Sequence, residues 1–153
     1  MNIIVVGGDG SVSLRPDTTL KWGVQDYWMP EPFSHVTACR CRFFPVLKMG
    51  KAVAPRFAGR YYDSWGPGVL IYGDGQNPYA DDSTYLCRNL LQSAAALDED
   101  ARAAIDGAIV KITSTTLIRR GDVIVLEDGC CGSFKPGDTV NPYDDASLSF
   151  RIC

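Results

Sequence analysis

The sequence has little of the chemistry that nucleic-acid-binding and membrane-spanning proteins need. Its 15 lysines and arginines are outnumbered by 18 aspartates and glutamates, so the formal net charge is −3. A protein that binds the phosphate backbone needs a basic surface, so we expect no nucleic-acid partner. The strongest apolar runs, residues 3–6, 69–72 and 123–126, are much shorter than the ~18 residues of a membrane-spanning helix, so we expect no membrane association.

The first ten residues also lack the features of a secretory signal. They contain no lysine or arginine, and their apolar stretch ends in glycine after four residues. We therefore expect a cytoplasmic protein. In that reducing compartment the six cysteines are expected to be free thiols.

The composition is that of a folded globular protein. Hydrophobic residues make up 46% and charged residues 22% of the 153 positions. A chain of this length buries roughly 70% of its extended surface and forms one domain of ordinary size. We expect residues 1–153 to form a single domain.

Most of the chain predicts short strands separated by Gly, Pro and Asp. The predicted strands are residues 2–6, 11–14, 39–47, 69–72, 123–126 and 136–140. Within residues 39–47, alternation places Cys39, Cys41 and Phe43 on one face of the strand. Arg40 and Arg42 then lie on the opposite face.

The helical signal is limited to three short segments. One covers residues 54–62, and a second is capped by Asp82 and Ser83 and runs through residue 91. The third is capped by Asp98 and ends at Gly107. The sequence therefore predicts a β-rich α+β domain.

The order of several short motifs resembles the fumarylacetoacetate hydrolase family. An apolar first strand is followed by Arg-Pro-Asp-Thr at residues 15–18, Gly-Lys at residues 50–51, and Phe-Ala-Gly-Arg-Tyr-Tyr-Asp at residues 57–63. Two Gly-Asp strands, residues 121–126 and 136–140, close the pattern. The resemblance implies a mixed β-roll or sandwich with two or three short helices, and a homodimer.

The family's chemistry uses a divalent cation, usually magnesium or calcium, held by carboxylates. The resemblance places Arg40 and Arg42 at the two glutamates of the family's Glu-x-Glu motif, and Val69 at the third ligand. The segment that carries the family's general base is absent between residues 6 and 11, and residues 127–129 replace its Gly-Thr-Pro loop. The resemblance thus implies neither a metal site nor catalytic residues in this chain.

Two arginines cannot hold a cation, because a guanidinium stays charged and has no lone pair to donate. If Arg40 and Arg42 face a common pocket, they could bind a small carboxylate or phosphate. The alternative, which we favour, is a solvated strand face where both arginines pair with surface acids.

The cysteines offer a second candidate site. His35, Cys39 and Cys41 could share one strand face and suit a soft metal such as zinc. An extended strand separates His35 from Cys41 by about 20 Å, too far for one ion. We favour buried cysteines that pack as small hydrophobes, and we expect the adjacent Cys130 and Cys131 to lie in a loop without forming a disulfide with each other.

Three functional hypotheses follow. The first is a catalytically degenerate protein with the fumarylacetoacetate hydrolase fold, metal-free and not an enzyme, that serves as a binding or interaction module. The second is an active metal-dependent hydrolase, isomerase or decarboxylase of 2-oxo acids or acylpyruvates, which would use magnesium or calcium and replacement ligands from Asp74, Asp81, Asp82 or Glu127. The third is a metal-free receptor for a small carboxylate, bound by Arg40 and Arg42.

Overall fold

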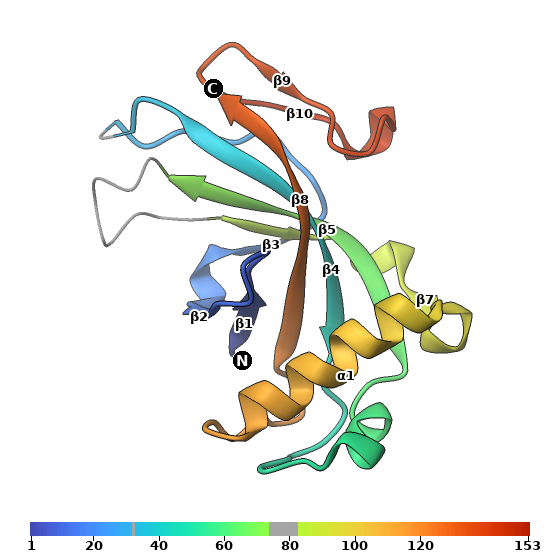
Figure 1. The fold of residues 1–153 in the computed structure, drawn as a ribbon. Coiled ribbons are helices and arrows are strands. Elements are labelled where there is room, and N and C mark those ends of the chain that lie inside the picture. The colour runs from blue at the N-terminus through green and yellow to red at the C-terminus, as the bar shows by residue number, and fades with distance from the viewer. Residues whose placement is uncertain (32, 74–82) are drawn as a thin grey trace.

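A computed structural model describes residues 1–31, 33–73 and 83–153. Within these residues, eight strands form one mixed sheet and two more form a separate hairpin (Figure 1). The strands of the main sheet are β1 (Ile3–Val6), β2 (Val12–Arg15), β3 (Leu20–Trp22), β4 (Val36–Pro45), β5 (Ser64–Gly73), β6 (Thr84–Leu86), β7 (Gln92–Ser93) and β8 (Val123–Phe134). The hairpin consists of β9 (Thr139–Val140) and β10 (Phe150–Arg151).

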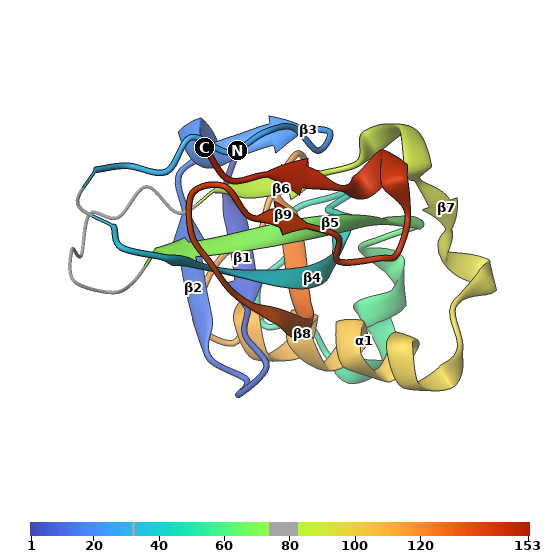
Figure 2. The ribbon, with the colours of Figure 1, turned by 90° about the horizontal axis from the view of Figure 1, so that it is seen from above.

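Two long strands, β4 and β8, form the middle of the sheet. They are antiparallel, and β4 is also antiparallel to β5 on its other side. The order across the sheet is β2-β1-β8-β4-β5-β6-β3, with β1 parallel to β8 and β3 parallel to β6. Viewed from above, the β9–β10 hairpin lies over the sheet, at the side away from α1 (Figure 2). This architecture confirms the β-rich α+β prediction.

The principal helix is α1 (Glu99–Thr113), which begins where the sequence predicts it. The Asp98 carboxylate accepts a hydrogen bond from the Ala101 N–H at 2.7 Å and caps the first turn. The predicted end at Gly107 is wrong. Ile109 and Ile112 continue the apolar stripe that Ile105 begins, and their burial against the sheet outweighs the low helix propensity of one glycine.

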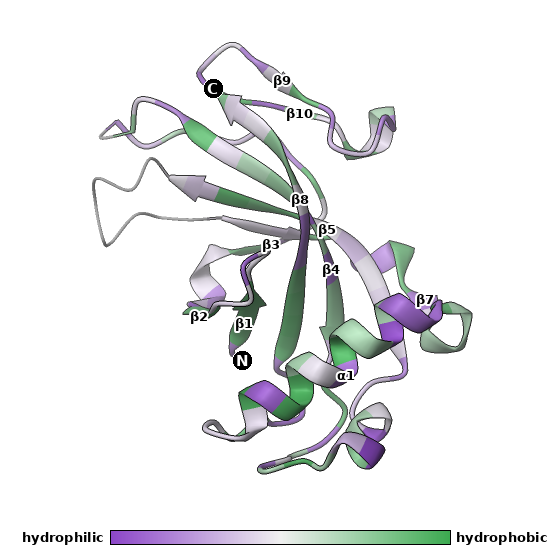
Figure 3. Ribbon diagram, viewed as in Figure 1, coloured by the Kyte–Doolittle hydropathy of each residue, from purple (hydrophilic) through white to green (hydrophobic). Residues whose placement is uncertain are grey.

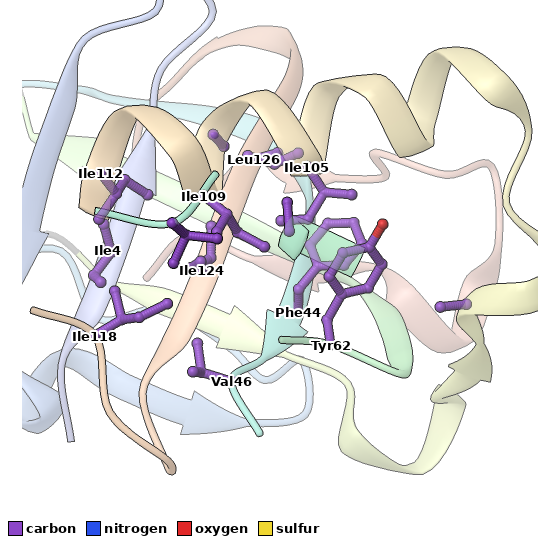
Figure 4. Close-up of a cluster of buried hydrophobic side chains, with 14 residues drawn as sticks. Ile4, Phe44, Val46, Tyr62, Ile105, Ile109, Ile112, Ile118, Ile124 and Leu126 are labelled. Carbon is purple, nitrogen blue, oxygen red and sulfur yellow. The ribbon is translucent and has the colours of Figure 1, made fainter. Parts of the chain in front are cut away.

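The face of the sheet beneath α1 holds the largest core cluster. Ile105, Ile109 and Ile112 point from the helix toward Ile4 of β1 and Ile124 of β8 (Figure 4). No helix within the described segments is long and apolar enough to cross a membrane.

The other helices of the described chain are 3-10 turns: η1 (Asp17–Thr19), η2 (Pro55–Arg60), η3 (Arg88–Leu90), η4 (Ala94–Ala96) and η5 (Ala146–Leu148). The helix predicted over residues 82–91 is wrong, and Asp82 itself lies outside the described residues. Tyr85 and Leu86 instead belong to β6 and are buried on opposite faces of the sheet, between β5 and β3. The four-to-five-residue spacing from Tyr85 and Leu86 to Leu90 and Leu91 is that of a helix, but these residues belong to a strand and to the turn that follows it.

Strand β8 is longer than the sequence predicts. It continues through residues 127–129, where a loop is expected, and through Cys130 and Cys131 to Phe134. Its first four residues are hydrophobic and buried, a hydrophilic stretch follows at Glu127 and Asp128, and most of the remainder is exposed (Figure 3). Gly129 and Gly132 have positive φ angles of 105° and 127°, and irregular pairing with β4 occurs in this stretch. The second half of β8 therefore projects beyond the main core.

The two faces of β4 have different surroundings, as its alternation predicts. Cys39, Cys41 and Phe43 belong to one buried cluster, which includes Leu70 of β5. Ala38, on the opposite face, belongs to a different cluster with Val69. Arg40 and Arg42 follow Ala38 along that second face.

Candidate functional site

A pocket of about 430 Å³ opens on the face of β4 that carries Cys39. Its lining comes from the turn after β1 and from three neighbouring strands, β4, β5 and β8. The lining residues are Gly7, Gly8, Asp9, Ser11, Thr37, Cys39, Tyr72, Glu127 and Cys130. Polar side chains and sulfur atoms therefore surround this pocket.

Glu127 occupies a central place in the pocket. Its Oε2 atom accepts a hydrogen bond from the Gly8 N–H, and its Oε1 atom lies 3.7 Å from the sulfur of Cys130. A Cβ atom at position 8 would lie 2.8 Å from Oε2, so any larger residue there would displace the Glu127 carboxylate. The carboxylate is thus held in a fixed orientation.

Tyr72 contributes a neutral hydroxyl beside Glu127. Burial raises the pKa of Tyr72 to about 12, and the neighbouring Glu127 carboxylate acts in the same direction. The Arg15 guanidinium lies 4.6 Å from the centre of the Tyr72 ring and opposes the shift. Arg15 is buried and donates hydrogen bonds to the Ser83 carbonyl at 2.8 Å and the Thr84 hydroxyl at 3.0 Å.

The pocket carries charges of both signs. The hydroxyl and backbone N–H of Ser11 stabilise the Asp9 carboxylate and lower the pKa of Asp9. Asp9 and Glu127 are acidic, and two basic side chains lie near them: Lys111 interacts with Asp9 and donates a hydrogen bond to the Gly10 carbonyl, and Arg15 lies against Tyr72.

The sulfur atoms of the two lining cysteines are bonded to each other. Cys39 and Cys130 face one another across β4 and β8 and form a disulfide, so the expectation that all six cysteines are free thiols is wrong. The other four, Cys41, Cys87, Cys131 and Cys153, are free. The 91 residues between the paired cysteines hide their proximity in the sequence.

Arg40 and Arg42 lie on the opposite face of β4 and do not line this pocket. Arg40 is exposed and pairs in register with Val69 of β5. Arg42 is half-buried, with its Nε atom 3.9 Å from the Asp128 carboxylate. That Nε is buried without a hydrogen-bond partner within the described segments.

Arg40, Arg42 and Val69, the residues that the sequence resemblance places at the family's metal ligands, do not fit a divalent cation held by oxygen ligands. Two guanidiniums and one alkyl side chain supply no donor atom to such a cation. Tyr143 packs on the same face of the sheet as Val69, and its hydroxyl lies between β4 and β5. That hydroxyl lies 2.7 Å from the Gly68 carbonyl and 3.0 Å from the Cys41 carbonyl, and it accepts from the Cys41 N–H at 3.3 Å.

The remaining sequence candidates are dispersed. His35 is exposed, and its Nδ1 atom lies 3.1 Å from the Ser34 hydroxyl rather than beside Cys39. Asp74, Asp81 and Asp82 lie outside the described residues, whereas Glu127 lines the pocket. Sequence reasoning missed Tyr72, Asp9 and Cys130, because no local motif connects these three segments.

The fold defines the class of protein. No protein-family model matches the sequence, and no curated protein matches it. Solved structures do match, and the chain has the fold of the fumarylacetoacetate hydrolase family, as the sequence motifs predict.

Three solved structures illustrate the likeness. A maleylpyruvate hydrolase from Sphingobium sp. shares 15% identity at a TM-score of 0.77, with 99% of this chain and 69% of that chain covered. A fumarylpyruvate hydrolase from Pseudomonas aeruginosa, in complex with Mn²⁺ and pyruvate, shares 11% identity at a TM-score of 0.77, with 99% of this chain and 89% of that chain covered. A fumarylacetoacetate hydrolase family protein from Yersinia pestis shares 14% identity at a TM-score of 0.72, with 99% of this chain and 92% of that chain covered. At these identities the likeness is one of fold.

Proposed function

We propose that this protein is a binding module, not an enzyme, which uses the fumarylacetoacetate hydrolase fold without that family's metal centre. The observation that carries the proposal is the residue set Arg40, Arg42 and Val69 on one face of β4 and β5. The fumarylpyruvate hydrolase from Pseudomonas aeruginosa holds Mn²⁺ and pyruvate. A chain that held such a cation at these strand positions would need oxygen donors there.

The proposed ligand is a small carboxylate, bound by Arg40 and Arg42. Support comes from Arg42, whose side chain is 26% exposed and whose Nε atom has no hydrogen-bond partner in the described part of the chain. The Asp128 carboxylate, at 3.9 Å, is too distant to accept a hydrogen bond from this Nε atom. Because the Nε atom itself is buried, a ligand carboxylate would accept hydrogen bonds from the exposed part of the guanidinium. We also propose a homodimer, which light scattering after gel filtration tests.

The test is calorimetry on protein with its disulfide intact. We expect succinate or oxaloacetate to bind with a dissociation constant of about 1 mM or below, and Mn²⁺ and Mg²⁺ not to bind in that range. Arg42→Gln should abolish binding of the dicarboxylate. Arg120→Gln, which removes an exposed arginine far along the chain, is the matched control and should leave binding unchanged.

Two results would contradict the proposal. Hydrolysis or decarboxylation of an acylpyruvate that a chelator abolishes would establish the enzyme alternative, with Glu127 as its candidate ligand among the described residues. Absence of dicarboxylate binding at concentrations well above 1 mM, or equal binding by Arg42→Gln, would remove the proposed arginine site.

A further inference from the structure

We propose that reduction of the Cys39–Cys130 disulfide turns the pocket into a binding site for a thiophilic divalent cation, with Zn²⁺ as the natural occupant. The ligands are the two thiolates and the Glu127 carboxylate. This site lies on the opposite face of β4 from Arg40 and Arg42, and it uses none of the positions that the sequence resemblance assigns to the family's metal ligands. It is therefore independent of the proposed carboxylate site.

The three ligand atoms are already close together. The sulfurs of Cys39 and Cys130 and a carboxylate oxygen of Glu127 all lie within 4.8 Å of one another. A tetrahedral zinc site with Zn–S bonds of about 2.3 Å separates its two sulfurs by about 3.8 Å. Register pairing of Cys39 with Cys130 keeps both sulfurs beside each other after the bond between them is broken.

Glu127 is oriented for this role by its neighbours. The Gly8 N–H holds Oε2, and the Tyr72 hydroxyl interacts with the same carboxylate. Oε1 therefore faces Cys130, 3.7 Å from its sulfur. Hydrogen bonds of this kind to a metal-ligating carboxylate fix its direction and strengthen binding.

The donor set selects the metal. Two thiolates and one carboxylate suit zinc, whereas magnesium and calcium prefer oxygen ligands alone. Three protein ligands leave a fourth tetrahedral position, which can take water or a ligand.

Reduction makes the site available, because disulfide sulfurs are not thiolates. Cys130 is exposed and Cys39 is buried, so a thiol reductant reaches the sulfur of Cys130. Attack there breaks the Cys39–Cys130 bond and forms a mixed disulfide, with Cys39 leaving as a thiolate that takes up a proton. A second reductant thiol then releases Cys130, and the two reductant molecules leave joined as a disulfide. Zinc binding displaces the two thiol protons.

The experiment compares the oxidised and reduced protein directly. Protein reduced with a phosphine and desalted without oxygen is titrated with Zn²⁺ against a chromophoric chelator. Co²⁺ then replaces Zn²⁺, to give thiolate-to-metal charge-transfer absorption. We expect one zinc per reduced chain, none per oxidised chain, and protection of Cys130 from alkylation when zinc is bound.

Matched variants identify the ligands. Cys130→Ser should abolish the charge-transfer band, and Glu127→Gln should weaken zinc binding at least about tenfold, the scale of losses at metal sites. Cys131→Ser is the control, since Cys131 is a free, exposed thiol beside Cys130. It should bind zinc as the unsubstituted protein does.

Three outcomes would overturn the proposal. These are absence of stoichiometric zinc on the reduced protein, equal binding by the oxidised protein, or equal losses in Cys131→Ser and Cys130→Ser. Circular dichroism of each variant excludes unfolding, and the alkylation assay reports the ligands in the unsubstituted protein even if a variant does not fold. None of these outcomes bears on the proposed carboxylate site, because the calorimetry with dicarboxylates uses oxidised protein and tests Arg42.

Discussion

The Tyr143 hydroxyl ties the C-terminal segment to the middle of the sheet, and its removal is the sharpest test of the fold. It is positioned between the carbonyls of Cys41 and Gly68 and also accepts from the Cys41 N–H. Burial raises the pKa of Tyr143, so the group remains a neutral donor at all physiological pH values. Tyr143→Phe deletes this one oxygen and keeps the ring.

The magnitude follows from the groups left without partners. A hydroxyl has one hydrogen and donates to one carbonyl at a time, so the substitution removes one donated and one accepted hydrogen bond. Each is worth about 1 kcal/mol net, which gives a loss of about 2 kcal/mol in the free energy of unfolding. For a chain of this size, about 2 kcal/mol corresponds to a decrease in Tm of about 4–8 °C.

Tyr85→Phe is the matched control. The Tyr85 hydroxyl is buried and has no hydrogen-bond partner among the residues that the structure describes, so its removal relieves a cost instead of adding one. We expect Tyr85→Phe to leave the free energy of unfolding unchanged or to increase it. Urea unfolding of both variants, with the disulfide intact, measures the difference, and hydrogen exchange of the Cys41 amide should accelerate in Tyr143→Phe alone. A difference below about 0.5 kcal/mol would refute the reasoning.

Three further predictions test other parts of the fold. Asp98→Ala removes the cap of α1 and should lower the free energy of unfolding by about 1 kcal/mol in urea titrations. Gly68→Ala would place a Cβ atom 2.4 Å from the backbone carbonyl oxygen of Tyr85 and should lower the free energy of unfolding by about 1–3 kcal/mol. Gly107→Ala, with open space around its Cβ atom, should raise the free energy of unfolding by about 0.5–1 kcal/mol because alanine favours the helix. The pKa of Tyr72 is raised from 10.0 to about 12, so its contribution to stability is complete below pH 10 and is lost as the pH rises toward 12; Tyr72→Phe should flatten that alkaline decline in thermal melts.

The sequence predicts the strands well where apolar residues form compact runs between turns. Residues 3–6 are all β-branched and residues 123–126 nearly so, and the two runs pair as parallel neighbours in the sheet. The helix predicted through Tyr85 fails because two adjacent large residues are buried on opposite faces of β6. Only the presence of β5 and β3 on either side decides that arrangement, and no local pattern encodes it.

The candidate site is less accessible to sequence reasoning than the fold. Alternation along β4 correctly separates Cys39 from Arg40, but it does not identify the neighbour of either side chain. The partner of Cys39 lies on β8, 91 residues away, and Glu127 reaches the same place because β8 continues beyond its predicted end. Long-range pairing of two strands therefore creates the pocket, and short-range patterns cannot predict it.

One step along β4 separates two different electrostatic environments. Cys39 faces a pocket with the acidic side chains Asp9 and Glu127, whereas Arg40 and Arg42 face the other side of the sheet. Two guanidiniums suit a dicarboxylate, whereas the thiolates and the carboxylate that the first environment offers after reduction suit a divalent cation. The two proposed ligands can therefore be assigned with two variants. Arg42→Gln should lose carboxylate binding and retain zinc binding, and Glu127→Gln should lose zinc affinity and retain carboxylate binding, which would place each ligand on its own face of the strand.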